Sequence, residues 1–183
     1  FYGCSSLTSV TLPPTITTLG ERVFSECSSL ESIAIPDTVI TLGDWLFAGC
    51  SSLTSVILPP AITNIWYGVF FGCSSLESIV IPDKVTYLGY SLFEGCSSLI
   101  SVTLPPTITT LGDKVFSECS SLESIVIPAT VNTLGHSLFD ECSSLISITL
   151  PPTITTLGDK VFFECSSLES IVIPETVTYL AYS

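Results

Sequence analysis

The amino-acid sequence predicts a solenoid of eight stacked 23-residue coils, with a parallel β-sheet, short extended or 3₁₀ return segments and little α-helix. Three observations support this prediction. Cysteine recurs at every twenty-third position, Ser-Ser-Leu follows every cysteine, and a short β-rich segment in each unit ends at proline. The chain has 183 residues, one fewer than eight complete units of 23. We therefore expect a single array over residues 1–183 that no linker or domain boundary interrupts.

The first unit shows how one coil is expected to form. Val10 and Leu12 alternate with polar residues, as in a strand with one buried face. Pro13 lacks a backbone N–H group, so the strand ends there and the chain turns. Ile16 and Leu19 lie three positions apart, which favours an extended or 3₁₀ return segment too short for an α-helix. A single coil leaves its apolar side chains uncovered, so only stacking can bury them.

The composition is apolar and acidic. Four Lys or Arg residues stand against 17 Asp or Glu residues, which gives a formal net charge of −13. Nucleic acid is therefore a disfavoured partner, because its phosphate backbone is also negative. No charged residue occurs from Trp45 to Leu76, but Pro59, Pro60 and the unbroken repeat assign this stretch to ordinary coils rather than to a membrane span. The absence of Met indicates a processed product or a piece of a longer chain.

The repeated unit resembles a known family. It reads F-x-[GE]-C-S-S-L-x-S-[VI]-x-[LI]-P, followed by the Ile and Leu-Gly positions, and it is similar to the BspA-like class of leucine-rich repeat in surface proteins of bacteria and protists. The resemblance implies a leucine-rich-repeat solenoid that is extracellular or at the cell surface and serves adhesion or surface structure, with no catalytic residue and no cofactor. The partners we expect are another copy of the chain, an extracellular protein or a glycan.

Odd and even units differ, so the complete period is two units, or 46 positions. Odd units contain L-P-P-x-I-T, whereas even units contain L-E-S-I-x-I-P. Glutamate at the start of the expected strand therefore occurs only in even units, at Glu31, Glu77, Glu123 and Glu169. These like charges are then roughly 10 Å apart, two coils of ~4.8 Å each, which is close to the Debye length at physiological salt.

The cysteines are expected to form one inward column of free thiols. Eight cysteines in a secreted chain ordinarily indicate disulfides. Here the identical phase makes neighbouring side chains point the same way, which disfavours disulfide geometry. A straight column also cannot surround a zinc ion with a tetrahedral shell. The column comprises Cys4, Cys27, Cys50, Cys73, Cys96, Cys119, Cys142 and Cys165.

Three further glutamates lack the two-coil spacing. Glu118, Glu141 and Glu164 precede cysteine in consecutive units. Repulsion among them would favour a weakly bound cation or partial protonation. The alternative, which the sequence favours, is that they are solvated carboxylates at the edge of the coil.

The third and fourth units are the least regular part of the array. Trp66 and Tyr67 replace the Gly-Asp pair found at this point in other units, and further aromatic residues lie nearby. We predict a contact patch for a protein, a glycan or another rod. An equally open alternative is that these rings pack along the return turns. The predicted patch comprises Trp45, Trp66, Tyr67, Phe71 and Tyr90.

No catalytic or metal site is expected. His136 is the only histidine and occupies a variable outward position, so the columns of serine cannot form a Ser-His-Asp set with it. Thr-x-Thr sequences resemble ice-binding arrays, but charged residues in even units interrupt them. The predicted function is a non-enzymatic structural or adhesive protein that stacks end to end into a fibre, because uncapped ends expose strand edges and core. The alternative is a ligand-binding ectodomain that recognises a host or partner protein or a glycan through the third and fourth units.

Overall fold

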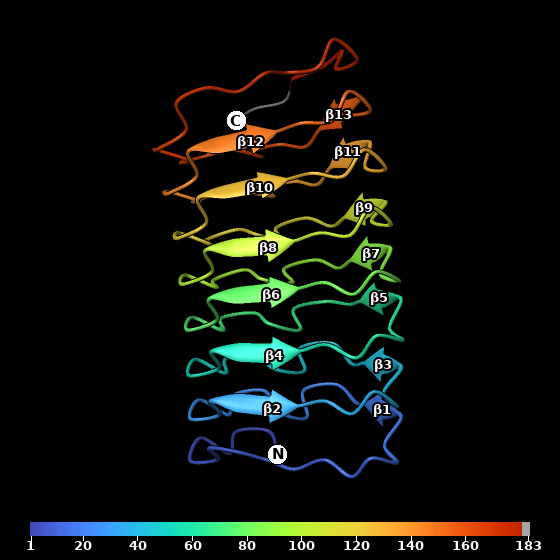
Figure 1. Ribbon diagram of the computed structural model, residues 1–183. Helices are drawn as coiled ribbons and strands as arrows, with labels where there is room; N and C mark the ends of the chain where they lie inside the picture. The colour runs from blue at the N-terminus through green and yellow to red at the C-terminus, as the bar shows by residue number, and fades with distance from the viewer. Residues whose placement is uncertain (181–183) are drawn as a thin grey trace.

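The computed structural model describes residues 1–180 and shows one stack of coils, with the N-terminal coil at one end and the C-terminal coil at the other (Figure 1). The described residues form strands and turns and contain no helix. The last three residues of the predicted array, 181–183, lie outside the described part.

Two kinds of strand recur along the stack. Strands of three residues, called long strands here, are β2 (Ser32–Ala34), β4 (Ser55–Ile57), β6 (Ser78–Val80), β8 (Ser101–Thr103), β10 (Ser124–Val126) and β12 (Ser147–Thr149). Strands of two residues, called short strands, are β1 (Thr18–Leu19), β3 (Thr41–Leu42), β5 (Asn64–Ile65), β7 (Tyr87–Leu88), β9 (Thr110–Leu111), β11 (Thr133–Leu134) and β13 (Thr156–Leu157).

The strands pair in parallel with a register of one repeat. Ile33 of β2 lies beside Val56 of β4, and Leu88 of β7 lies beside Leu111 of β9. Each partner is therefore 23 positions further along the chain, and buried residues fall beside buried residues. The predicted solenoid with a 23-residue spacing is confirmed.

The return segments are extended, which is one of the two predicted forms. The described residues contain no 3₁₀ turn at this point, and the segments pair with one another as the short strands. Strands β5, β7, β9, β11 and β13 form one five-stranded sheet, and β1 pairs with β3. The reason is the local sequence: the Thr-Leu pair of most short strands places one side chain outside and one inside, as a half-buried strand requires.

The two end coils are less regular than the coils between them. The first coil has the short strand β1 but no long strand, and only a single bridge, from Thr11 to Ala34, stands in its place. The described part of the eighth coil forms no strand. A terminal coil has a hydrogen-bonding neighbour on one side only, so its ladder is incomplete. Long strands are consequently found in six of the eight units.

The long strands also pair two by two. Ladders join β2 to β4, β6 to β8, and β10 to β12, but none joins β4 to β6 or β8 to β10. At the two places without a ladder, between β4 and β6 and between β8 and β10, the surface has openings, which are shallow grooves of about 680 and 410 Å³. Each ladder connects an even unit to the following odd unit, so the two-unit period of the sequence reappears in the backbone pairing.

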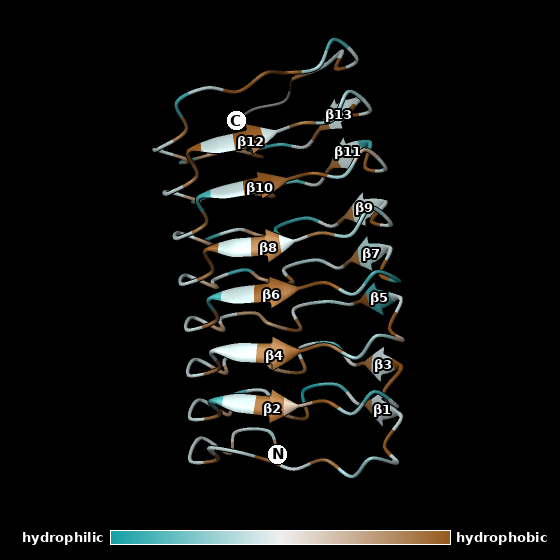
Figure 2. Ribbon diagram, viewed as in Figure 1, coloured by the Kyte–Doolittle hydropathy of each residue, from teal (hydrophilic) through white to brown (hydrophobic). Residues whose placement is uncertain are grey.

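The core consists of columns of identical or similar apolar residues, and Figure 2 shows hydrophobic residues at the same place on successive coils. Phenylalanine forms the central column, with the rings of neighbouring coils nearly parallel, 2–12° apart in plane and 5.4–5.8 Å apart between centroids. From Phe24 to Phe139 these rings are fully buried. Offset stacking is a favourable arrangement for aromatic pairs, so each added coil extends the column.

The thiols make a second column beside the phenylalanines. From Cys27 onward, each Sγ donates a hydrogen bond to the carbonyl oxygen of the phenylalanine 26 residues earlier, at 3.0–3.2 Å. All eight cysteines of the described chain are free, those from Cys27 to Cys142 are buried, Cys165 is half-buried and Cys4 is exposed. Burial raises the pKa of Cys50 to about 12 and that of Cys165 to about 11.

The thiol column predicts that the fold loses stability in alkali. Cys73, Cys96 and Cys119 are buried at the centre of the stack, and burial raises the pKa of each above its ordinary value of 9.0. Above about pH 9 these thiols ionise in the unfolded chain but not in the folded chain. Each thiol therefore lowers the free energy of unfolding by about 1.4 kcal/mol per pH unit. Urea unfolding followed by circular dichroism should show the free energy of unfolding falling from about pH 8 to about pH 10.5.

The double variant Cys73→Ala, Cys96→Ala serves as the control. It removes two titrating groups, so its stability should start lower at about pH 8 and decline less steeply. Equal slopes for the variant and the parent chain would show that the thiols do not cause the decline.

Candidate functional site

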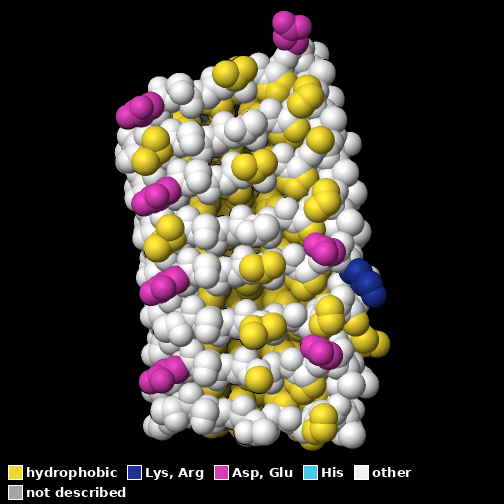
Figure 3. Space-filling model, in the orientation of Figure 1, with side chains coloured by type: hydrophobic (Ala, Val, Ile, Leu, Met, Phe, Trp, Pro, Cys, Tyr) yellow, Lys and Arg dark blue, Asp and Glu magenta, His cyan; other side chains and the backbone are white. Residues whose placement is uncertain are grey.

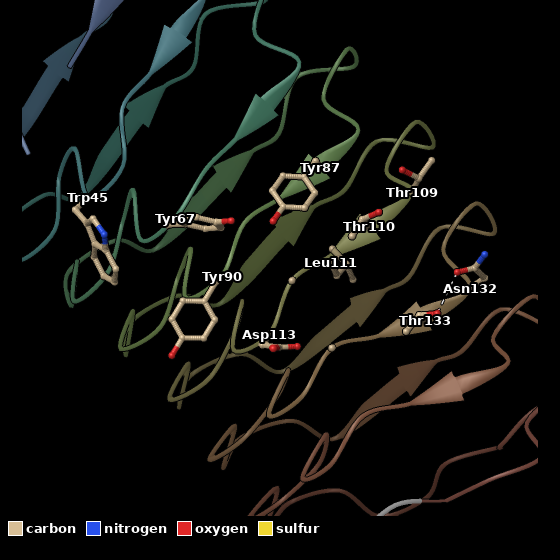
Figure 4. A pocket seen from close by; sticks show the side chains of 12 residues that line it. Trp45, Tyr67, Tyr87, Tyr90, Thr109, Thr110, Leu111, Asp113, Asn132 and Thr133 are labelled. Atoms are coloured by element: carbon tan, nitrogen blue, oxygen red, sulfur yellow. Dashed lines mark hydrogen bonds between the residues drawn. The ribbon is translucent and has the colours of Figure 1, made fainter. Parts of the chain in front are cut away.

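A groove of about 680 Å³ lies on the side of the short strands, over β7, β9 and β11 (Figure 4). Two repeat positions form it. One position holds Tyr67, Tyr90 and Asp113 in units three to five, and it follows a glycine in units four and five and Trp66 in unit three. The other opens the short strand and holds Tyr87 and Thr110 in units four and five.

The groove exists because bulky residues give way to small ones along these two positions. Units three and four supply the rings of Tyr67, Tyr87 and Tyr90, which form one wall of the groove. Units five and six supply Thr110 and Thr133 at the strand position, and these form a low floor beside the tyrosines together with Gly112 and Gly135 of the glycine column. Since every coil has nearly the same backbone, this step in side-chain size makes a hollow on an otherwise even surface.

Trp45 closes the aromatic end of the groove, and its ring is held in place. The ring lies over Gly68, where a Cβ atom would come within 2.2 Å of the indole carbon Cε3. Gly68 also has a φ of +56°, a conformation that favours glycine. On another side, the ring of Phe71 meets the indole edge-on, at 5.5 Å and 68°. The indole therefore has little freedom to turn.

Trp66 supports the wall from outside the groove. Its ring lies 5.3 Å from that of Tyr87 and 6.4 Å from that of Tyr67. Burial is the main cause that raises the pKa of Tyr87, and the neighbouring Tyr67 raises it further, so the hydroxyl of Tyr87 stays protonated at neutral pH. It can then both donate and accept a hydrogen bond.

The floor carries oriented polar groups. Asp113 Oδ1 accepts a hydrogen bond of 2.8 Å from the backbone N–H of His136. The hydroxyl of Thr133 donates to Asn132 Oδ1 at 3.2 Å (Figure 4). The hydroxyl of Thr109 donates to the backbone of the preceding coil at 3.1 Å. These bonds fix the carboxylate, amide and hydroxyl groups before any ligand arrives.

The structure divides the predicted aromatic patch. Trp45, Tyr67 and Tyr90 line the groove, whereas Trp66 stands behind it. Phe71 borders a separate shallow pocket of about 310 Å³ on the other side of Trp45. The rings pack against one another, and Trp66, Tyr67, Phe71 and Tyr90 remain 38–43% exposed. That these residues form a contact patch for a partner stays a prediction.

Sequence reasoning missed the polar half of the groove and left Tyr87 out of the predicted patch, although Tyr87 is one of the nearby aromatic residues. The available signal was repeat phase: Tyr87 and Thr110 occupy the same repeat position in successive units, and so do Tyr90 and Asp113. Aligning the units by column would have placed the tyrosines beside these polar residues.

Glu118, Glu141 and Glu164 line up along one edge without converging. Their backbone φ values are 59°, 59° and 54°, and glycine occupies the same repeat position in other units, such as Gly49 and Gly72. Desolvation, and then repulsion from Glu118 and Glu164, raises the pKa of Glu141. Within residues 1–180, no group of three or more His, Cys, Asp or Glu side chains is arranged to hold a metal ion.

The single histidine has a local structural contact. Its Nδ1 accepts a hydrogen bond of 2.9 Å from the backbone N–H of Asp159 in the next coil. Threonine hydroxyls likewise donate to the preceding coil, as from Thr107 to the carbonyl of Val85 at 2.8 Å. These polar columns therefore connect coils.

Comparison with known proteins identifies the family of the chain. A family model described as BspA type leucine-rich repeat region (6 copies) matches residues 1–100 and 64–183. The chain belongs to this BspA-type leucine-rich repeat family. No curated protein matched the sequence, and no helix within the described residues is long and apolar enough to cross a membrane.

Solved structures of bacterial leucine-rich repeat proteins are similar to this chain. The T. pallidum leucine-rich repeat protein is 31% identical with a TM-score of 0.84, over 88% of this chain and 78% of that one. A leucine-rich repeat protein from Bacteroides ovatus is 26% identical with a TM-score of 0.66, over 97% of this chain and 63% of that one. A leucine-rich cell surface protein from Faecalibacterium prausnitzii is 25% identical with a TM-score of 0.52, over 97% and 70%.

Proposed function

We propose that this BspA-type leucine-rich repeat chain is a non-enzymatic structural or adhesive protein, displayed at the cell surface or secreted. The observation that carries the proposal is the architecture: a repeated scaffold whose polar side chains join coil to coil. The similarity to a protein described as a leucine-rich cell surface protein supports the location. The family match supports the role of a scaffold.

We further propose that copies of this chain associate end to end. The support is the phenylalanine column, in which the rings of neighbouring coils stack at 5.4–5.8 Å and each added coil extends the stack. A second copy whose coils stack in the same register would continue this column, and such a head-to-tail contact gives filaments.

Electron microscopy and sedimentation of the purified chain across a range of concentrations test this association. Rods should lengthen as the concentration rises, and Phe1→Lys should shorten them because a charge then enters the stacking face. A rod of constant single-chain length at every concentration would contradict the association.

A second function rests on the aromatic groove. We propose that it binds a glycan, since a sugar ring presents an apolar face that packs on tyrosine or tryptophan and hydroxyls that bond to carboxylate and amide groups. The supporting observation is that Tyr67, Tyr87 and Tyr90 stand beside the oriented Asp113 and Asn132 in one open groove.

Titration with a panel of neutral oligosaccharides, read by tryptophan fluorescence, tests the glycan site. Tyr87→Ala should weaken binding by at least about ten-fold, a loss of ~1.4 kcal/mol. Tyr179→Ala is the matched control, because Tyr179 occupies the same repeat position four coils further along and lies outside the groove. Equal effects of the two substitutions, or no binding to any sugar, would contradict the proposal.

A further inference from the structure

The face of the long strands carries an exposed apolar stripe. The third residue of each long strand points outward, and four units carry a large aliphatic residue at this repeat position: Ile57, Val80, Val126 and Val172 are 81%, 69%, 71% and 81% exposed. Exposed Thr103 and Thr149 interrupt the stripe in the units between the valines. The openings after β4 and β8 add shallow apolar hollows to this stripe. This face is separate from the aromatic groove, which lies on the short-strand side.

Acidic residues flank the stripe on both sides. Figure 3 shows acidic side chains along the margins of this face and hydrophobic side chains between them. On one margin, the exposed glutamates precede the long-strand serines in even units; on the other, exposed acids follow the proline. The first row is Glu31, Glu77, Glu123 and Glu169, and the second is Asp37, Asp83 and Glu175, with Lys84 as its basic residue.

The charges indicate what kind of surface can cover the stripe. A second copy placed face to face would bring glutamate rows against glutamate rows, so self-association through this face is disfavoured. Anionic lipid and nucleic acid are disfavoured for the same reason. A partner must therefore offer apolar side chains bordered by positive charge.

We propose that the long-strand face binds a basic amphipathic α-helix that lies along the axis of the solenoid. The helix places its apolar side over Ile57, Val80 and Val126, and its Lys or Arg residues opposite the flanking carboxylates. This inference goes beyond the proposed adhesive scaffold and does not depend on the glycan groove.

The two-coil spacing of the glutamates fits a helix. Phenylalanine rings of neighbouring coils are 5.4–5.8 Å apart, so glutamates two coils apart are separated by roughly 10 to 12 Å along the stack, from twice the ~4.8 Å strand spacing to twice the ring spacing. Residues seven apart on an α-helix lie about 10.5 Å apart and on the same side. A basic residue in each heptad thus meets one glutamate after another without a change of register. A β-strand reaches this distance in three residues, which puts successive side chains on opposite faces.

The test measures binding of a synthetic peptide to the full chain by fluorescence anisotropy. The probe is an amphipathic peptide of about three heptads, each with lysine flanking a leucine face. A peptide of the same composition, shuffled so that it has no apolar side, is the control ligand.

Three protein variants accompany the parent chain. One replaces the glutamate row, in Glu31→Gln, Glu77→Gln, Glu123→Gln and Glu169→Gln. Another replaces the stripe, in Ile57→Ser, Val80→Ser and Val126→Ser, all exposed positions. The matched control removes the same number of charges at another repeat position, in Glu26→Gln, Glu118→Gln, Glu141→Gln and Glu164→Gln. Circular dichroism establishes that each variant is folded.

The proposal expects the amphipathic peptide to bind the parent chain at least about ten-fold more tightly than the shuffled peptide. The glutamate-row and stripe variants should each lose about ten-fold or more in affinity, whereas the matched control should change less than about two-fold. Equal affinity for both peptides would show that net charge alone explains binding and would overturn the proposal. A loss of affinity in the matched control equal to that of the glutamate-row variant would overturn it for the same reason. Retained affinity in the stripe variant would also overturn it.

Discussion

The structure depends on one constraint: each coil must repeat the backbone path of the coil before it, exposing and burying the same positions of the repeat. Parallel ladders, phenylalanine stacking and thiol-to-carbonyl bonds all join neighbouring coils with nearly the same offset. A residue in one column therefore meets its own kind in the next coil. This is why the core can be uniform, and why the surface changes character wherever a column changes residue.

That constraint also explains where distinct surfaces arise. The groove forms where tyrosine gives way to Asp113 and threonine in two adjacent columns. The long-strand face differs, because alternation between odd and even units imposes a two-coil period on both its charges and its ladders. The same scaffold thus presents an aromatic and polar groove on one side and an apolar stripe with acidic margins on another. Since both surfaces are borne by the stacked coils, their residues are held at fixed spacings.

Most of the fold follows from the sequence because repeat spacing fixes strand register directly. The inward positions of Phe93 and Cys96 are readable from phase alone. The two-by-two pairing of long strands was not readable, because both unit types have equally good strand sequences and the opening appears only when coils stack. The groove was only half predicted: aromatic residues attract notice as an irregularity, whereas Asp113 looks ordinary until its column is aligned with Tyr90. The apolar stripe was not predicted, because most outward positions of the repeat hold serine or threonine and the outward face therefore looks uniformly polar in the sequence.

The most direct test of the account is the distance between equivalent positions on the stack. Spin labels on Ser32→Cys and Ser147→Cys, five coils apart, can be measured by pulsed electron paramagnetic resonance after Cys4 and Cys165 are replaced by alanine. Five intervals give about 24 to 29 Å, from the ~4.8 Å spacing of paired strands to the 5.8 Å between phenylalanine rings. A single narrow distribution in that range is the predicted result. A broad distribution, or a distance well outside the range, would contradict a stack with a 23-residue register.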